Sequence, residues 1–409
     1  MIAVTAPLWV GLIFGMLFGA IGELWGIGNP ETLIRLARWK DRLLFGCIAI
    51  ASAVGAVVLY GLYACGFSMH FSPKPAYVFG VTLGGLLFGA GMAVSGYVPG
   101  SELMALGEGR RDALYALPGG LLGAAAWTML YQTAVGRWLV HTANLGNLIA
   151  SGPIDCIHPT FTFVIAVGYA IALLALVMFL PRYAGGRSFV VRAVRGGSDA
   201  LDREFVADTA AYLAEGSFYE GRSRWLSRVI KDDVPNSNFF SPVKLGMSAV
   251  VGVAAVLAIF FRQIFGESTT YSWIVGNLLL PDFEYSKIMA KRAGWEPLSD
   301  MGTFVGALLT ALFISRYFQG FRPVIPPSWR NRFGSSLGKR AIASFGGSCV
   351  MMFGARMADG CTSGHILSGG VQMAASAWLF TLAVSTSMIV TARVVYGDSS
   401  EKCKPDDRA

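Results

Sequence analysis

Charged residues are scarce in this chain. Asp, Glu, Lys and Arg make up 14% of its 409 residues, whereas a soluble domain carries about 25%. Hydrophobic residues make up 54%, so a soluble fold of this size would have too few charges to cover its surface. Aromatic residues, at 12%, exclude a disordered chain. The composition therefore indicates an integral membrane protein that crosses the bilayer several times.

Motifs of enzymes, metal sites and nucleotide-binding proteins are also missing. Six Cys in 409 residues are too few for a disulfide scaffold. The four His are scattered, without the His-Glu-x-x-His spacing of a zinc protease, and there is no Walker loop. The formal net charge of +8 is interpreted as Lys and Arg in cytoplasmic loops. We expect no enzyme activity, no cofactor, no metal and no nucleic-acid partner.

Nine apolar stretches approach the length of about 20 residues that a membrane-spanning helix needs. They cover residues 5–25, 43–65, 76–98, 113–135, 161–181, 243–262, 301–318, 341–358 and 371–396. The predicted fold class is thus an all-α polytopic membrane protein with about nine transmembrane helices. The predicted domains are a first membrane half (1–181), a charged cytoplasmic linker (182–242), a second membrane half (243–396) and a cytoplasmic tail (397–409).

The connections between these helices alternate in their content of Lys and Arg. Four connections together carry 20 of these residues, and the others carry 5. The four rich connections are 26–42, 101–112, 182–242 and 319–340. Because Lys and Arg are enriched in cytoplasmic loops, we expect an inner (plasma) membrane protein with its N-terminus outside and its C-terminus in the cytoplasm. Glu102 and Glu108, which follow the third helix, are then expected at the cytoplasmic surface.

The two membrane halves share a sequence repeat. Residues 88–93 read FGAGMA, and residues 353–358 read FGARMA. Each copy follows a pair of glycines and precedes a Gly-x-x-x-Gly stretch and a long apolar helix. By the predicted helix count, the first copy runs inward and the second runs outward. An inverted repeat of this kind places a substrate site near the bilayer midplane, where the two copies meet.

The end of each repeat copy contains residues that interrupt a helix. Residues 96–101 read GYVPGS, and residues 360–365 read GCTSGH. Backbone that unwinds within a membrane lines a cavity or is buried in protein, and the half-helix that follows offers free N–H groups to an anion. A plain helix-packing face is the alternative for these glycines. The backbone positions that we expect at the anion site are Gly96, Pro99, Gly100, Gly360 and Gly364.

These residues resemble the YeeE/YedE family of sulfur-compound transporters. Residues 354–369 (GARMADGCTSGHILSG) are similar to the C-terminal signature of the family, and residues 96–101 are similar to its first-half partner. Residues 26–30 (GIGNP) resemble the first-helix motif of a longer branch. The resemblance implies a thiosulfate importer in which the anion passes between cysteine thiols. It also implies a cytoplasmic sulfur-carrier or sulfurtransferase protein that accepts the product.

The chain departs from the family pattern in its cysteines. Val98 stands where the family usually has Cys, and the first predicted helix lacks the Cys that the shorter branch carries near its end. Cys361 is the one cysteine at a matching position. The relay between thiols is therefore incomplete, which leaves a different substrate open.

Several side chains at the two repeat ends are candidates to contact the substrate. They are Tyr97, Ser101, Cys361, Thr362, Ser363 and His365. Cys361 can donate a weak S–H hydrogen bond to a soft sulfur anion, or it is a small core residue. Tyr97 and Ser101 align with Cys361 and His365 in the repeat, so they are donors from the opposite side or they pack. His365 either binds the substrate or a proton, or it caps the second half-helix.

Three charged residues are expected inside the membrane, where charged residues usually pair or face a cavity. Arg356 and Asp359 lie three positions apart on a helix, so we predict that they pair and lock the loop. Direct attraction of the anion by Arg356 is the other interpretation. Glu23, near the end of the first helix, is either a proton carrier or a partner for unpaired backbone.

We therefore predict an importer of a small sulfur-containing anion in the lipid bilayer, with thiosulfate as the first candidate. One alternative is a transporter or channel of the same fold for another solute, such as selenite, sulfite or a small neutral molecule. The other alternative is a membrane docking subunit that binds a cytoplasmic partner through residues 182–242. Uptake of thiosulfate that depends on Cys361 distinguishes the first hypothesis from both others.

Overall fold

The computed structural model describes residues 4–184, 186–195, 242–315, 318 and 320–397. Over these ranges the chain is almost entirely helical, and its only sheet is a hairpin of two short antiparallel strands, β1 (Leu148–Ile149) and β2 (Gly152–Pro153). Most of the predicted linker and the predicted tail lie outside the described residues. The predicted domain boundaries therefore stay predictions.

The first half of the chain forms a series of long helices joined by short ones. In chain order they are α1 (Val10–Trp25), α2 (Pro30–Ala37), α3 (Leu43–Ala64), α4 (Val78–Ser95), α5 (Pro99–Gly107), α6 (Ala113–Tyr131), α7 (Ala134–His141), the 3₁₀ turn η1 (Ile154–Cys156), α8 (Pro159–Phe179) and α9 (Phe189–Arg195). The hairpin β1–β2 lies between α7 and η1.

The second half follows the same alternation of long and short elements. In chain order they are α12 (Pro242–Phe261), α13 (Thr269–Leu278), α14 (Glu284–Arg292), α15 (Glu296–Leu309), the π-helix η2 (Thr310–Ile314), α16 (Pro327–Phe333), α17 (Leu337–Met357), the π-helix η3 (Thr362–Gly369) and α18 (Ala375–Tyr396).

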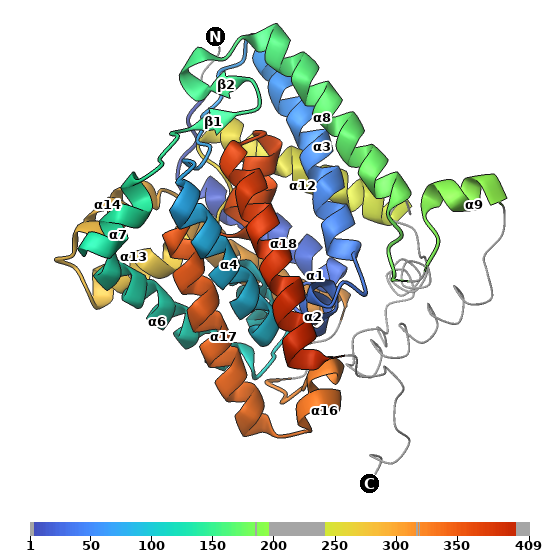
Figure 1. Ribbon diagram of the computed structural model, residues 1–409, viewed down its shortest axis with the longest axis vertical. Coiled ribbons are helices and arrows are strands. Elements are labelled where there is room, and N and C mark those ends of the chain that lie inside the picture. Colours follow the sequence, from blue (N-terminus) through green and yellow to red (C-terminus); the bar gives the residue numbers. More distant parts are fainter. Residues whose placement is uncertain (1–3, 185, 196–241, 316–317, 319, 398–409) are drawn as a thin grey trace.

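All nine predicted membrane helices are present in the described ranges. Seven helices are long and apolar enough to cross a bilayer, and the two bent pairs α1–α2 and α17–η3 bring the number to nine. The prediction of an all-α polytopic membrane protein is thereby confirmed. The hairpin β1–β2 lies at one end of the long axis of the molecule, and α16 lies at the other end (Figure 1). The Lys- and Arg-poor connection with the hairpin and the rich connection with α16 therefore face opposite sides.

The predicted helix interruptions at residues 96–101 and 360–365 are also confirmed. α4 ends at Gly96, whose φ of +73° is a left-handed conformation that glycine adopts readily. α17 gives way to η3 with a bend of 49°, and Asp359 between them has a φ of +61°. A residue with a Cβ atom seldom adopts that conformation, and π-helices such as η3 are frequent at functional sites.

The two halves meet along α4 and α17, which cross at glycines. A Cβ atom on Gly84 would lie 2.5 Å from the carbonyl oxygen of Gly354, and one on Gly91 would lie 2.5 Å from the carbonyl oxygen of Gly347. Small residues at such a crossing let two backbones approach closely. One glycine of each pair that precedes a repeat copy, Gly84 in the first half and Gly347 in the second, thus belongs to this contact.

Two further pairs of helix contacts are equivalent between the two halves. α1 packs on α15 as α12 packs on α3, and α4 packs on α18 as α17 packs on α6. Glycines make these contacts too: a Cβ atom on Gly15 of α1 would overlap Ser299 of α15, and one on Gly252 of α12 would overlap Ala51 of α3. The elements α1–α2, α3, α4–α5 and α6 of the first half therefore correspond to α12–α13, α15, α17–η3 and α18 of the second.

Candidate functional site

Four helix interruptions contribute to one cavity of about 410 Å³. Its volume lies within the range of roughly 300–1,000 Å³ that is usual for small-molecule sites. The lining residues from the interruptions are Trp25 and Ile27 (α1–α2), Val98 and Ser101 (α4–α5), Glu267 (before α13), and Thr362 and Ser363 (start of η3). Apolar side chains of α3, α8 and α18 form much of the remaining wall. The inverted repeat thus brings its irregular segments together at one place.

The start of α5 offers backbone donors to this cavity. Pro99 takes the first helical position, and the Ser101 hydroxyl fixes the turn. It accepts a hydrogen bond from the Val98 N–H at 2.8 Å and donates one to the Val98 carbonyl at 2.9 Å. The first N–H groups of a helix have no acceptor within that helix, and they form the positive end of its dipole. The N–H groups of Gly100 and Ser101 are therefore suited to an anion.

A carboxylate occupies this helix end. Both side-chain oxygens of Glu267 lie 2.0 Å from the position that a Cβ atom on Gly100 would take. Glu267 is only 2% exposed, and its Oε1 atom has no hydrogen-bond partner within the described residues. The Ser363 hydroxyl, from the other repeat copy, is hydrogen-bonded to the carboxylate. Glu267 therefore joins the two predicted loops, a role that no motif in the sequence indicates.

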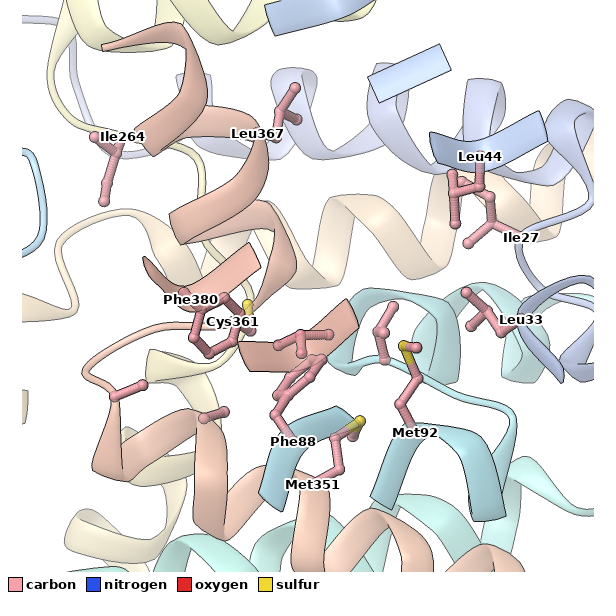
Figure 2. Close-up of a cluster of buried hydrophobic side chains, with 14 of the residues drawn as sticks. Ile27, Leu33, Leu44, Phe88, Met92, Ile264, Met351, Cys361, Leu367 and Phe380 are labelled. Carbon is pink, nitrogen blue, oxygen red and sulfur yellow. The ribbon is translucent and has the colours of Figure 1, made fainter. Parts of the chain in front are cut away.

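The start of η3 supplies the cavity with hydroxyl groups rather than with the thiol. Thr362 and Ser363 line the cavity. The Cys361 side chain is 1% exposed and belongs to a hydrophobic cluster with Phe88 and Phe380 (Figure 2). Its Sγ atom lies 3.1 Å from the Ser363 Oγ atom. The thiol thus does not line the cavity itself but contacts Ser363, which does.

His365 holds the interruption together from the inside. Its Nε2 atom is hydrogen-bonded to the Ala358 carbonyl at 2.8 Å, and its ring stacks on Phe380 with the ring centroids 4.6 Å apart. The side chain is completely buried and is absent from the cavity lining. His365 thus binds a carbonyl group at the end of α17, and the predicted capping of the second half-helix stays a prediction.

Arg356 and Asp359 lie close together, as predicted for a pair. The Arg356 Nη2 atom is 3.7 Å from the Asp359 Oδ1 atom. Arg356 also donates hydrogen bonds to the Tyr285 hydroxyl, at 2.9 Å from Nε and 2.6 Å from Nη2, and to the Ser268 hydroxyl at 3.0 Å. The guanidinium group therefore fastens α17 to α14 and to the start of α13, and it does not line the cavity.

Two further cations surround Asp359. The Lys74 Nζ atom lies 3.8 Å and the Arg292 Nη1 atom 3.4 Å from the Asp359 Oδ2 atom. The Asp359 carboxylate raises the pKa of Arg292. Together with Arg356, three positively charged side chains therefore surround the single carboxylate of Asp359. About half of the Arg292 side chain is exposed. The Lys74 Cε atom lies 3.9 Å from the position of a Cβ atom on Gly364, so this cationic cluster covers the η3 interruption.

Tyr97 takes part in a separate buried network. Its hydroxyl donates a hydrogen bond to the Asp112 Oδ1 atom at 2.8 Å. Arg340 donates to the Asp112 Oδ2 atom at 2.9 Å from Nε and 2.7 Å from Nη2, and to the Ser95 carbonyl at 2.6 Å. Tyr97 is fully buried and does not line the cavity, whereas the next residue, Val98, does. This network fixes the break after α4 from the side away from the cavity.

The acidic side chains of α1 and α5 are buried, and the prediction that Glu102 and Glu108 lie at the cytoplasmic surface is wrong. Glu102 is fully buried and accepts a hydrogen bond from the Tyr271 hydroxyl at 2.7 Å. Glu108 is 2% exposed, faces Glu23, and lies 3.6 Å from Arg110. The reason is that α5 ends inside the protein. A Cβ atom on Gly107 would lie 2.8 Å from the backbone nitrogen of Leu308 in α15.

Glu23 therefore belongs to a buried polar group and not to the cavity lining. Its Oε1 atom accepts a hydrogen bond from the Ser315 hydroxyl at 3.3 Å. Trp25, two residues later, does line the cavity, and its indole N–H is a buried donor without a partner in the part of the chain that the structure describes. The signal for Trp25 was its place at the end of the first helix, where a family branch has a cysteine.

A helical membrane protein whose interrupted helices converge on one small cavity has the architecture of a membrane transport protein. The sulphur-transport family model matches residues 30–390, so the chain belongs to this family. The chain is also 23% identical over 376 residues to the thiosulfate transporter TsuA of Spirochaeta thermophila. That alignment covers 92% of this chain and 95% of the relative. The predicted resemblance is confirmed, and the chain is a transport protein rather than an enzyme.

Proposed function

We propose that this protein imports a small sulfur-containing anion, thiosulfate in the first place, across the inner membrane. The cavity between the helix interruptions is the site through which the anion passes. The family match and the similarity to a thiosulfate transporter support the substrate class. The distribution of Lys and Arg supports a cytoplasmic C-terminus, so that the connection with Lys74 faces outward.

The observation that carries the proposal is the set of donors around one cavity. The hydroxyl groups of Thr362 and Ser363, the indole N–H of Trp25 and the backbone N–H of Ser101 belong to residues of its wall. These groups donate hydrogen bonds, and the dipole of α5 adds positive potential. An anion that has left its hydration shell needs such donors, because unpaired charge within a membrane protein is costly.

Entry starts at the cationic cluster of Lys74, Arg292 and Arg356 around Asp359. Clustered charge of one sign raises the local concentration of a counter-ion and its rate of arrival. The cluster covers the start of η3, where Ser363 contacts the cavity. The anion then exchanges water for the hydroxyl and N–H donors and leaves toward the cytoplasm. A cytoplasmic sulfur-carrier or sulfurtransferase protein is the acceptor in this proposal.

Cys361 acts in this scheme through Ser363. The two side chains are in hydrogen-bond contact, so a shift of Ser363 toward the anion leaves the thiol free to follow with its own S–H. A soft sulfur atom is a better partner for a thiol than an oxygen is. With Val98 in place of a cysteine, the donors on the opposite wall are the indole N–H of Trp25 and the backbone N–H of Ser101.

A second candidate substrate is an oxyanion of the sulfite or selenite type. The donors that line the cavity are O–H and N–H groups, while the thiol of Cys361 lies behind them. Such donors recognise oxygen atoms irrespective of a terminal sulfur. Competition distinguishes the two substrates. A tenfold excess of sulfite or selenite should inhibit thiosulfate uptake only if the site binds the anion through its oxygen atoms.

Uptake of sulfur-35-labelled thiosulfate tests the proposal. The host is a bacterium without thiosulfate importers of its own, carrying the wild-type chain, Cys361→Ala or Cys349→Ala. Cys349 is half-buried on α17 and does not line the cavity, so Cys349→Ala is the matched control. We expect uptake with the wild type and the control, and slower uptake with Cys361→Ala. Absence of uptake by correctly inserted wild-type protein contradicts the proposed substrate, and full uptake by Cys361→Ala contradicts the role of the thiol.

A further inference from the structure

Glu267 is the only charged residue that lines the cavity in the described part of the chain. Its carboxylate sits at the N-terminus of α5, in contact with Gly100. That helix end is also a backbone site suited to an anion. Glu267 and a transported anion therefore compete for the same space and for the positive potential of the same helix end.

The surroundings of Glu267 are strongly acidic. Glu296 and Asp300 of α15 and Glu102 of α5 are all buried near it. Tyr271 of α13 bonds to Glu102, and the thiol of Cys361 lies near Asp300.

One cation, Arg356 of α17, reaches the start of α13 through Ser268 and Thr269 and interacts with Glu296. A single cation does not neutralise four carboxylates, so an anion that enters beside an ionised Glu267 meets strong repulsion in a medium of low dielectric.

A proton on Glu267 removes this conflict. The neutral carboxyl group no longer competes for the α5 N-terminus, and its O–H becomes one more donor for the anion. The Oε1 atom of Glu267 is buried and has no hydrogen-bond partner within the described residues, so it is positioned to accept that proton.

We propose that Glu267 carries a proton together with each transported anion, so that this protein is a proton-coupled symporter. The inference rests on the proposed function, and it adds the driving force. The carboxylate takes a proton from the outer side, leaves the α5 N-terminus and admits the anion. After the anion has left toward the cytoplasm, the carboxyl group releases its proton there and the carboxylate returns to Gly100.

The test uses the purified full-length protein in liposomes that enclose a pH-sensitive dye. Valinomycin and equal potassium on both sides hold the membrane potential at zero. Labelled thiosulfate is added outside, and uptake and internal acidification are followed together. We expect acidification that requires thiosulfate, and a lumen one pH unit more alkaline should raise accumulation by about tenfold for one proton per anion.

Exchange of labelled for unlabelled thiosulfate at equal pH reports transport independently of protons. Wild-type protein that exchanges thiosulfate but takes it up without acidification overturns proton coupling and leaves the proposed function in place. Wild-type protein that does not exchange thiosulfate overturns both. This comparison needs no variant, so it stands even if a substitution at Glu267 prevents folding.

The variant Glu267→Gln keeps the shape of the side chain and cannot lose a proton. We expect it to exchange thiosulfate without acidification and without a response to the pH gradient. The matched control is Glu284→Gln, at a half-exposed residue of α14 that pairs with Arg137 at the surface; it should behave like the wild type. Acidification by Glu267→Gln at the wild-type ratio of protons to anions would show that another group carries the proton and would overturn the assignment.

Discussion

Glu267 and Gly100 are in direct contact although they belong to different halves of the chain. Both carboxylate oxygens of Glu267 lie 2.0 Å from where a Cβ atom on Gly100 would be. Glycine is therefore required at position 100 by the space that the carboxylate takes and not by a left-handed backbone, because Gly100 lies within α5. The contact links the start of α5 to the α12–α13 connection.

Gly100→Ala tests this contact. The added methyl group must displace the Glu267 carboxylate from the helix end, and overpacking of this kind costs about 1–3 kcal/mol. We expect a lower thermal midpoint and slower thiosulfate uptake. Gly168→Ala is the control, because a Cβ atom on Gly168 of α8 meets nothing within 4 Å. Unchanged uptake and stability in Gly100→Ala would show that the carboxylate can leave this position without consequence.

Trp25→Phe tests the indole donor on the cavity wall. The substitution keeps an aromatic ring and removes a buried N–H group that has no protein partner within the described ranges. Because a hydrogen bond to a charged group contributes about 1.5–3 kcal/mol, the concentration of thiosulfate for half-maximal uptake should rise by about tenfold or more. Trp273→Phe, at a partly exposed Trp of α13, should leave it unchanged. Equal values for both variants would exclude a contact between the anion and the indole N–H.

Asp112→Asn tests the network that fixes the break after α4. Arg340 is 2% exposed and relies on Asp112 for its only salt bridge in the described structure. Removal of one partner of a buried ion pair typically costs about 3–5 kcal/mol. We expect a marked drop in the unfolding temperature measured by tryptophan fluorescence in detergent. Glu284→Gln breaks an exposed pair and should cost about 1 kcal/mol or less; a similar loss for both variants would contradict the importance of the buried network.

Cys65 and Cys156 provide a test of orientation. Both are exposed, and both lie at connections that are poor in Lys and Arg, which we expect outside the cell. A membrane-impermeant maleimide should therefore label intact cells that carry the wild-type chain. The double variant Cys65→Ser/Cys156→Ser should lose this labelling, because Cys47 and Cys361 are buried, Cys349 is half-buried within the membrane helix α17, and Cys403 belongs to the predicted cytoplasmic tail. Labelling of Cys65 and Cys156 only after permeabilisation would reverse the proposed orientation.

Much of the architecture could be predicted from the sequence. A long apolar segment crosses a bilayer as a helix, because its backbone N–H and C=O groups must then be hydrogen-bonded within the segment itself. The nine spans, the two interruptions and the family followed from that rule and from the FGAGMA and FGARMA copies. The interruption at Gly96 was predictable because Gly and Pro together break a helix locally.

The side-chain roles at the site were harder to predict. Tyr97 aligns with Cys361 in the repeat, yet its hydroxyl turns to Asp112, a residue 15 positions later. His365 lies in the specific motif and binds the carbonyl of Ala358 within its own loop. An alignment of repeats relates backbone positions, but the partners of a side chain depend on neighbours that are not repeated.

The sequence by itself determined the membrane class, the helix count, the inverted repeat and the family, because each depends on local patterns of hydrophobicity and on short motifs. Only the tertiary structure decided which groups face the cavity. Glu267 and Trp25 stand outside the repeat motif, and they reach the site because glycine contacts such as Gly84–Gly354 bring the two halves together. The same packing buries Cys361 behind Ser363, since a free thiol behaves as a small apolar group and is stable in the hydrophobic cluster that includes Phe88 and Phe380.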